Sequence, residues 1–131
     1  MLNANHIMKQ VISTTAAPGA SGPYSQAIDT GAFVFASGQI PINPATGEIP
    51  EGIENQTTQA LKNVGAILNA AGLDYSNVVK TTVFLSDMSH FGAMNGIYES
   101  FFSAPYPARS AVAVRELPKG VLVEVEVIAA R

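Results

Sequence analysis

The stretch Val121-Leu122-Val123-Glu124-Val125-Glu126-Val127-Ile128 decides the fold of this chain. Successive side chains of a strand point to opposite faces, so the four valines form one apolar face that belongs against a core. The other face carries Leu122, Glu124, Glu126 and Ile128. The pattern predicts a strand over residues 121–130 with one face buried in the core. The other face mixes aliphatic and charged residues, so it is expected to be neither fully solvent-exposed nor fully buried.

Two helices are predicted upstream of this strand. Apolar residues recur at three- and four-residue spacing over residues 53–71, which is typical of an amphipathic helix, and Gly72 is expected to end it. A second helix is expected to begin within residues 86–89, and Pro105 and Pro107 lie beyond its end. Its apolar face holds Phe91, Met94, Tyr98, Phe101 and Phe102.

Short β-prone runs predict four more strands, over residues 9–13, 32–37, 78–85 and 110–114. Within 78–85, the side chains of Val79, Val83 and Leu85 are expected to share one face. The resulting order, β-β-α-β-α-β-β, predicts an α+β fold in which both helices pack on one face of a single sheet.

The composition argues against several classes of function and predicts contact between subunits. Charged residues make up 13% of the 131-residue chain, about half of what is usual for soluble domains, while 47% of the residues are hydrophobic. We therefore expect part of the surface to be buried against sister subunits. The net charge of −3 argues against a nucleic-acid partner. Cysteine is absent and the two histidines lie far apart in the sequence, so no thiol chemistry and no metal site are expected.

The chain length predicts one domain over residues 1–131, with residues 1–8 as a flexible extension. The start of the chain lacks the basic and apolar regions of a signal peptide, and no stretch has the length and apolarity of a membrane span. A cytoplasmic protein without a membrane partner is the expectation.

Arg109 lies in Tyr106-Pro107-Ala108-Arg109-Ser110 at the mouth of a predicted strand. A guanidinium can bind a carboxylate through two parallel hydrogen bonds. A surface arginine beside a loop is the alternative, but this residue is one of only three arginines in the chain.

Glu124 and Glu126 allow two interpretations. They can belong to a solvated strand face, or to a cleft between subunits in which one carboxylate handles a proton.

Three further sites carry polar groups in unexpected places. Asn95 lies on the apolar side of its helix, where helix capping or a backbone hydrogen bond is the simplest explanation. Ser37 and Gly38 close an apolar strand and can face a ligand or form a turn. Tyr24 follows Gly22-Pro23, a pair that restricts the loop conformation. The loop can therefore present the Tyr24 phenol to a pocket.

Several stretches of the sequence occur together in a fixed order. They are Gly22-Pro23-Tyr24-Ser25-Gln26-Ala27, Ala36-Ser37-Gly38-Gln39-Ile40-Pro41, Asn63-Val64 through Ala70-Ala71-Gly72, Val79-Lys80-Thr81-Thr82-Val83, Tyr106-Pro107-Ala108-Arg109-Ser110 and Glu124-Val125-Glu126. Together they closely resemble the RidA (YjgF/YER057c/UK114) family of reactive-intermediate deaminases, from about Ile12 to Arg131.

The resemblance implies a chorismate-mutase-like fold and a homotrimer with three clefts between subunits. It also implies hydrolysis of 2-iminobutanoate or 2-iminopropanoate, which are tautomers of the enamines released by pyridoxal-phosphate-dependent dehydratases, to 2-oxo acids and ammonia. The imine carbon is already electrophilic, so neither a metal nor an organic cofactor is required.

Roles for individual residues follow from the same resemblance. Arg109 matches the carboxylate-binding arginine of the family, and Glu124 matches its water-positioning glutamate. Many members have cysteine where this chain has Ala111, and that position is expected to contribute its backbone carbonyl. Glu126 inherits no role. The remaining matches, all to cleft-lining positions, are Tyr24, Ser37, Gly38 and Asn95.

Other functions are compatible with the same residues. A non-catalytic protein that binds small carboxylates such as 2-oxo acids would look identical in sequence, and only turnover separates the two. A deaminase for aminoacrylate from another pathway is a further alternative. An endoribonuclease or translation inhibitor fits poorly, because the chain has no basic stripe interleaved with aromatic residues.

Overall fold

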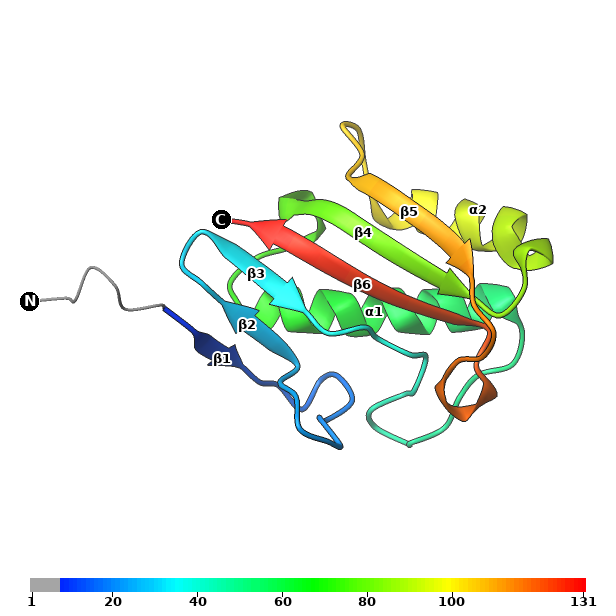
Figure 1. The fold of residues 1–131 in the computed structure, drawn as a ribbon, viewed down its shortest axis with the longest axis horizontal. Helices are drawn as coiled ribbons and strands as arrows, with labels where there is room; N and C mark the ends of the chain where they lie inside the picture. The colour runs from blue at the N-terminus through cyan, green and yellow to red at the C-terminus, as the bar shows by residue number, and fades with distance from the viewer. Residues whose placement is uncertain (1–7) are drawn as a thin grey trace, which may run out of the picture.

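A computed structural model describes residues 8–131 and shows one mixed sheet of six strands with two helices (Figure 1). The predicted extension lies outside the described residues except for Met8. Strands follow the order β1-β2-β3-β6-β4-β5; β4 and β5 are parallel, and the other neighbours are antiparallel. The elements are β1 (Gln10–Ile12), β2 (Ala27–Asp29), β3 (Phe33–Ala36), α1 (Ile53–Ala70), β4 (Val78–Leu85), α2 (Phe91–Phe101), β5 (Ala108–Ala113) and β6 (Val123–Ala130).

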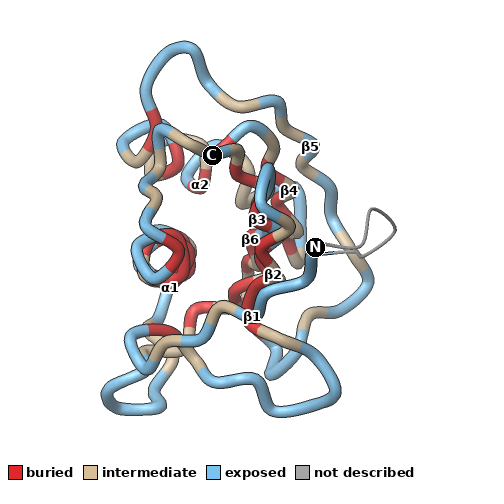
Figure 2. Tube along the Cα trace, turned by 90° about the vertical axis from the view of Figure 1, so that its left-hand side faces the viewer, coloured by how far each residue is buried: buried red, intermediate tan, exposed pale blue. Residues whose placement is uncertain are grey.

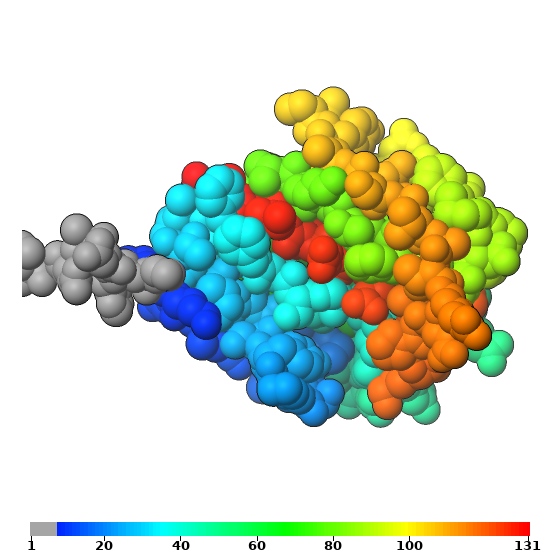
Figure 3. Space-filling model, viewed as in Figure 1, coloured from blue at the N-terminus to red at the C-terminus, as the bar shows by residue number. Residues whose placement is uncertain are grey.

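Both helices lie on the same face of the sheet, as predicted (Figure 2). The three valines of β6 are buried on this face, each at most 1% exposed, in one core cluster with the apolar side of α1, and Val121 before the strand is also buried, at 2%. The alternation that the sequence predicts for residues 121–128 is therefore confirmed. Within residues 8–131, no helix covers the opposite face, which we call the open face. Side chains of β3, β6, β4 and β5 reach its surface (Figure 3).

The prediction of five strands was wrong, because β2 was missed. This strand has only three residues, too few for a periodic signal. It is held by pairing on both sides, with Ile28 opposite Val11 of β1 and Phe35 of β3. Long-range pairing, and not local sequence, makes it a strand.

The predicted face of β4 was also wrong at one residue. Val83 and Leu85 are buried, but Val79 is 45% exposed. The pairing of β4 with β6 shifts register between Val78 and Lys80, which is the mark of a β-bulge. The extra residue turns Val79 away from the core, while Val78 takes the buried place.

Helical structure begins within the predicted range 86–89 as a short 3₁₀ turn, and α2 itself begins two residues beyond that range, at Phe91. The Asp87 carboxylate accepts a hydrogen bond from the Ser89 N–H and caps a short 3₁₀ turn, Met88–His90, that leads into α2. Met94 and Tyr98 on this helix are buried against the core.

Candidate active site

Arg109 is fixed at the start of β5, beneath α2. In the parallel pairing it lies opposite Thr81 of β4, whose side chain is fully buried on the helix face. Arg109 therefore leaves the sheet on that face as well. There its Nη1 donates a 2.6 Å hydrogen bond to Oδ1 of Asn95. The simplest expectation for Asn95, helix capping or a backbone hydrogen bond, is therefore wrong. Its side chain instead holds the Arg109 guanidinium.

Two aromatic rings of α2 also contact this guanidinium. Its Cζ lies 4.7 Å from the ring centroid of Tyr98 and 5.4 Å from that of Phe91. Tyr98 is itself anchored, because its hydroxyl is 2.7 Å from Oγ1 of Thr81 in the core. The sequence pattern alone places Phe91 and Tyr98 on an apolar helix face. The signal for a site is their spacing around Asn95, four residues after Phe91 and three before Tyr98.

The charge of Arg109 has no carboxylate partner among residues 8–131, where the one ion pair joins Arg131 and Asp29. Arg109 lines a cavity of about 370 Å³ together with Asn95, Tyr98, Glu99, Tyr106 and Pro107. With Nη1 bonded to Asn95, the other nitrogen donors remain for a ligand, and a small carboxylate matches their charge and geometry.

Glu124 lies on the open face of the sheet, opposite Phe84 of β4. Its carboxylate is half-buried. Burial raises the pKa of Glu124 above its usual range, and the negative charge of nearby Glu126 raises it further. Glu126 lies opposite Thr82 on the same face and is exposed. Of the two carboxylates, Glu124 has the environment of a proton acceptor.

Gly38 packs directly against the Glu124 carboxylate. A methyl group at Gly38 would overlap Oε2 of Glu124. The backbone passes this close because Gln39, the next residue, exchanges hydrogen bonds of 2.8 and 3.1 Å with Val125 of β6. Glycine at this position therefore leaves the space that the Glu124 carboxylate occupies, and a larger residue would displace that carboxylate.

Ser37 ties the end of β3 to the loop before β2. Its Oγ donates to the Ser25 carbonyl at 2.6 Å, and its N–H donates to the Gln26 carbonyl at 2.9 Å. The hydroxyl hydrogen is thus used within the chain, while the oxygen lone pairs remain to accept from a ligand. Tyr24 from the same loop is 52% exposed. One cavity of about 580 Å³ is lined by Tyr24, Ser37, Gly38, Glu124 and Glu126, together with Lys119 and others.

Ala111 lies two residues after Arg109 and packs its side chain against the core. Only its backbone can face a ligand, as the resemblance implies. β5 is an edge strand that pairs with β4 alone, so part of its backbone N–H and C=O groups point away from the sheet.

The predicted site residues therefore form two groups within one chain. Arg109, Asn95 and Ala111 lie on or beneath the helix face, whereas Tyr24, Ser37, Gly38 and Glu124 line the open-face cavity. β4 lies between β5 and β6, and Arg109 and Glu124 are three positions apart along it. Standard strand spacings place their backbones roughly 14 Å apart, with side chains on opposite faces. One small substrate cannot contact both within a single copy.

Neither a metal cluster nor a membrane helix is found in the part of the chain that the structure describes. No three His, Asp or Glu side chains there gather as metal ligands would, and none of the helices has the length and apolarity to cross a bilayer.

A family model described as Endoribonuclease L-PSP matches residues 14–131. The chain belongs to this family, the RidA (Endoribonuclease L-PSP) family. The resemblance drawn from the sequence motifs is thus confirmed. Among RidA relatives, the 2-iminobutanoate/2-iminopropanoate deaminase of Mus musculus is 51% identical over 94% of this chain and 92% of its own length. The protein of the same name in Escherichia coli K12 is 50% identical over 95% and 99%.

RidA-family structures also share the fold. The crystal structure of E. coli TdcF with bound serine superposes with a TM-score of 0.91 at 49% identity, covering 94% of this chain and 99% of that one. The structure of RidA from the Antarctic bacterium Psychrobacter sp. PAMC 21119 gives a TM-score of 0.90 at 45% identity, covering 93% and 99%. The predicted fold family is confirmed, with six strands in place of five.

Proposed function

We propose that this RidA-family chain hydrolyses 2-iminobutanoate and 2-iminopropanoate to the corresponding 2-oxo acids and ammonia. Two full-length relatives of about half identical sequence carry this activity in their names. The observation that carries the proposal is the guanidinium of Arg109, which is held by Asn95 and two rings of α2 but has no carboxylate partner among residues 8–131.

The reaction needs three groups in place: a partner for the substrate carboxylate, an oriented water, and a base. Arg109 binds the carboxylate. Glu124 orients the water and takes its proton while the water oxygen forms a bond to the imine carbon and the C=N electron pair moves to nitrogen. That proton then passes from Glu124 to the nitrogen, which makes it a leaving group. The C–N bond breaks and ammonia leaves, while Glu124 takes the hydroxyl proton and the hydroxyl oxygen becomes the carbonyl of the 2-oxo acid. The negative charge of Glu124 also stabilises the protonated imine.

The opposite orientation of Arg109 and Glu124 requires a second copy of the chain. We expect each site to take Arg109, Asn95 and Ala111 from one copy, and Tyr24, Ser37, Gly38 and Glu124 from another. The open face offers apolar surface for such contact, because Phe33, Phe35 and Val112 are each more than 40% exposed. Together with the family resemblance, this favours a homotrimer.

Sedimentation equilibrium tests the trimer. We expect a mass three times that of the 13.7 kDa chain at micromolar concentration. A stable monomer there would contradict both the trimer and the composite site.

Turnover of fresh substrate tests the function. 2-Aminoacrylate and 2-aminocrotonate, the enamine tautomers of the two imines, are generated in place by a dehydratase, and ammonia and 2-oxo acid are followed together. We expect both products to form faster in proportion to added protein. If the protein binds 2-oxobutanoate in calorimetry but leaves the hydrolysis rate unchanged, it is a carboxylate-binding protein and not a deaminase.

A further inference from the structure

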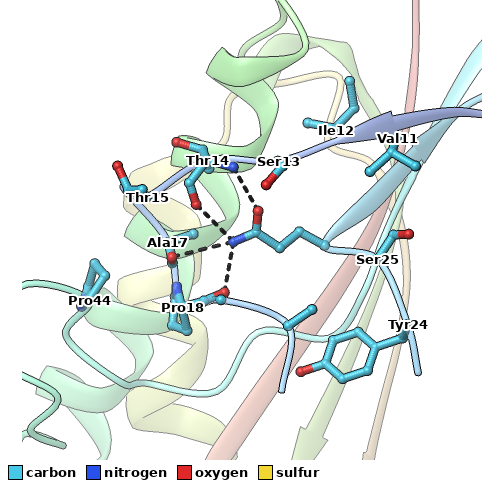
Figure 4. Close-up of a pocket in the computed structure, with 13 residues that line it drawn as sticks. Val11, Ile12, Ser13, Thr14, Thr15, Ala17, Pro18, Tyr24, Ser25 and Pro44 are labelled. Carbon is cyan, nitrogen blue, oxygen red and sulfur yellow. Dashed lines mark hydrogen bonds between the residues drawn. The ribbon is translucent and has the colours of Figure 1, made fainter. Parts of the chain in front are cut away.

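The loop before β2 is organised around one buried side chain, that of Gln26, which is 5% exposed. Its Oε1 accepts a 2.7 Å hydrogen bond from the Thr14 N–H. Its Nε2 lies 3.0 Å from the Thr14 carbonyl, 2.8 Å from that of Pro18 and 3.4 Å from that of Ala17 (Figure 4). All four bonds reach backbone groups between residues 14 and 18.

These backbone groups have no strand or helix to pair with, since β1 ends at Ile12 and β2 begins at Ala27. Buried backbone groups need partners, and a carboxamide supplies a donor and an acceptor on one planar group. A glutamate in its place would be acceptor-only when ionised and would face two or three carbonyl oxygens. The amide of Gln26 thus takes the place of secondary structure in this loop.

The same residue connects the loop to the cavity that holds Glu124. The backbone carbonyl of Gln26 accepts the Ser37 N–H, and the carbonyl of its neighbour Ser25 accepts the Ser37 hydroxyl. Pro18, Gly19, Tyr24 and Gln26 line both the Glu124 cavity and a second cavity of about 620 Å³. The loop therefore contributes residues to both cavities, and Tyr24, which is among them, is shown with the other lining residues of the second cavity in Figure 4.

We infer that Gln26 is a positioning residue, which holds the loop 14–24 so that Tyr24 keeps its place at the wall of the active-site cavity. The catalytic part of this inference rests on the proposed function. Its structural part does not, because it concerns the shape of the loop with or without turnover.

Hydrogen exchange of the wild-type protein is the first test. The Thr14 amide lies in a loop next to exposed residues, and it is expected to exchange slowly only because it donates to Gln26 Oε1. Exchange of Thr14 as fast as in an unstructured peptide would overturn the inference.

A double-mutant cycle with Gln26→Glu and Tyr24→Ala is the second test. We expect Gln26→Glu to lower kcat/KM for imine hydrolysis by about tenfold to a hundredfold, since small misplacements far from the chemistry cost about that much. In the Tyr24→Ala background the same change is expected to have little further effect. Fully additive losses would overturn the inference; where Gln26→Glu does not fold, Gln26→Met replaces it.

Gln56→Glu is the matched control. Gln56 is also a buried glutamine, 7% exposed, whose amide bonds the Pro50 carbonyl and the Leu122 N–H, away from the loop. We expect it to cost stability while leaving slow exchange at Thr14, and its effect on kcat/KM to add to that of Tyr24→Ala. Equal coupling of both glutamines to Tyr24 would show a general loss of stability and overturn the inference. Absence of any turnover in the wild type would instead contradict the proposed function, and the exchange result would still stand.

Discussion

At the scale of single residues, the structure shows which contacts orient the Arg109 side chain and which environment suits Glu124 for proton transfer. Arg109 is held by one hydrogen bond and two aromatic contacts, so its orientation is set before any ligand binds. Glu124 is half-buried beside Gly38 and has a raised pKa, as a group that takes a proton near neutral pH should. Each residue type was predictable from the sequence, whereas the contacts that orient it were not.

Replacing Arg109 by Lys tests the carboxylate contact. Lysine keeps the positive charge but loses the planar fork that binds two oxygens and stacks on Tyr98. We expect Arg109→Lys to weaken binding of 2-oxobutanoate in calorimetry and to lower kcat/KM, each by about tenfold or more. Unchanged binding and turnover would show that the carboxylate is held elsewhere.

Replacing Glu124 by Gln tests the base. The variant keeps the shape of the side chain and loses its charge, so we expect nearly wild-type binding of 2-oxobutanoate and a loss of kcat of about 10²–10⁴-fold. Glu126→Gln is the control and is expected to turn over imine at close to the wild-type rate at neutral pH. Full turnover by Glu124→Gln together with an inactive Glu126→Gln would mean that the wrong carboxylate was chosen.

The pH profile adds an independent readout on the same pair. Glu124 must be ionised to accept a proton, so kcat/KM should fall as the pH decreases through its raised pKa. Because the charge of Glu126 helps to raise that pKa, Glu126→Gln should move this acid limb to lower pH. An acid limb that stays in place in Glu126→Gln would contradict the assignment of the limb to Glu124.

At the scale of elements, predictability followed the strength of the local pattern. The alternation in β6 and the helical spacing in α1 were visible in sequence, because burial on one face leaves a periodic trace. The strand β2 and the bulge at Val79 leave no such trace, since both depend on which strands happen to pair. The role of Gln26 was missed for a similar reason, because the backbone groups that its side-chain amide bonds can be known only from the folded loop.

The ends of three elements meet at one ion pair. Arg131, which follows β6, donates to the Asp29 carboxylate of β2 at 2.7 Å and to the Ala71 carbonyl at the end of α1 at 2.7 Å. The hydrogen bond from Arg131 lowers the pKa of Asp29 below its ordinary value of 3.8, helped by the Gly31 N–H. The stabilisation is complete above that ordinary pKa and is lost as the pH falls through the lowered one.

Asp29→Asn tests this linkage. We expect the variant to be less stable than the wild type in urea unfolding at pH 7, and the difference in unfolding free energy to shrink as the pH is lowered below 3.8. A difference that stays constant between pH 7 and this acid range would show that the ionised carboxylate is not what stabilises the junction.

At the scale of the whole molecule, the function depends on how the sheet places Arg109 relative to Glu124. Arg109 and Glu124 leave the sheet on opposite faces, on strands separated by β4. Both residues were predicted from sequence, and the composite site came from the family resemblance. The structure adds the physical reason: the strand register prevents one copy from presenting both groups to one substrate.

Mixing two variants with impaired turnover tests this claim most directly. Arg109→Lys and Glu124→Gln are each purified, dissociated together in mild denaturant and reassembled, and imine hydrolysis is measured. If each site takes its arginine and its glutamate from different copies, random mixing in equal amounts restores about a quarter of the sites to the wild-type pair. We predict recovery to about a quarter of wild-type activity. If mixed oligomers form, as seen by mass spectrometry, and activity stays at the level of the separate variants, the composite site is wrong.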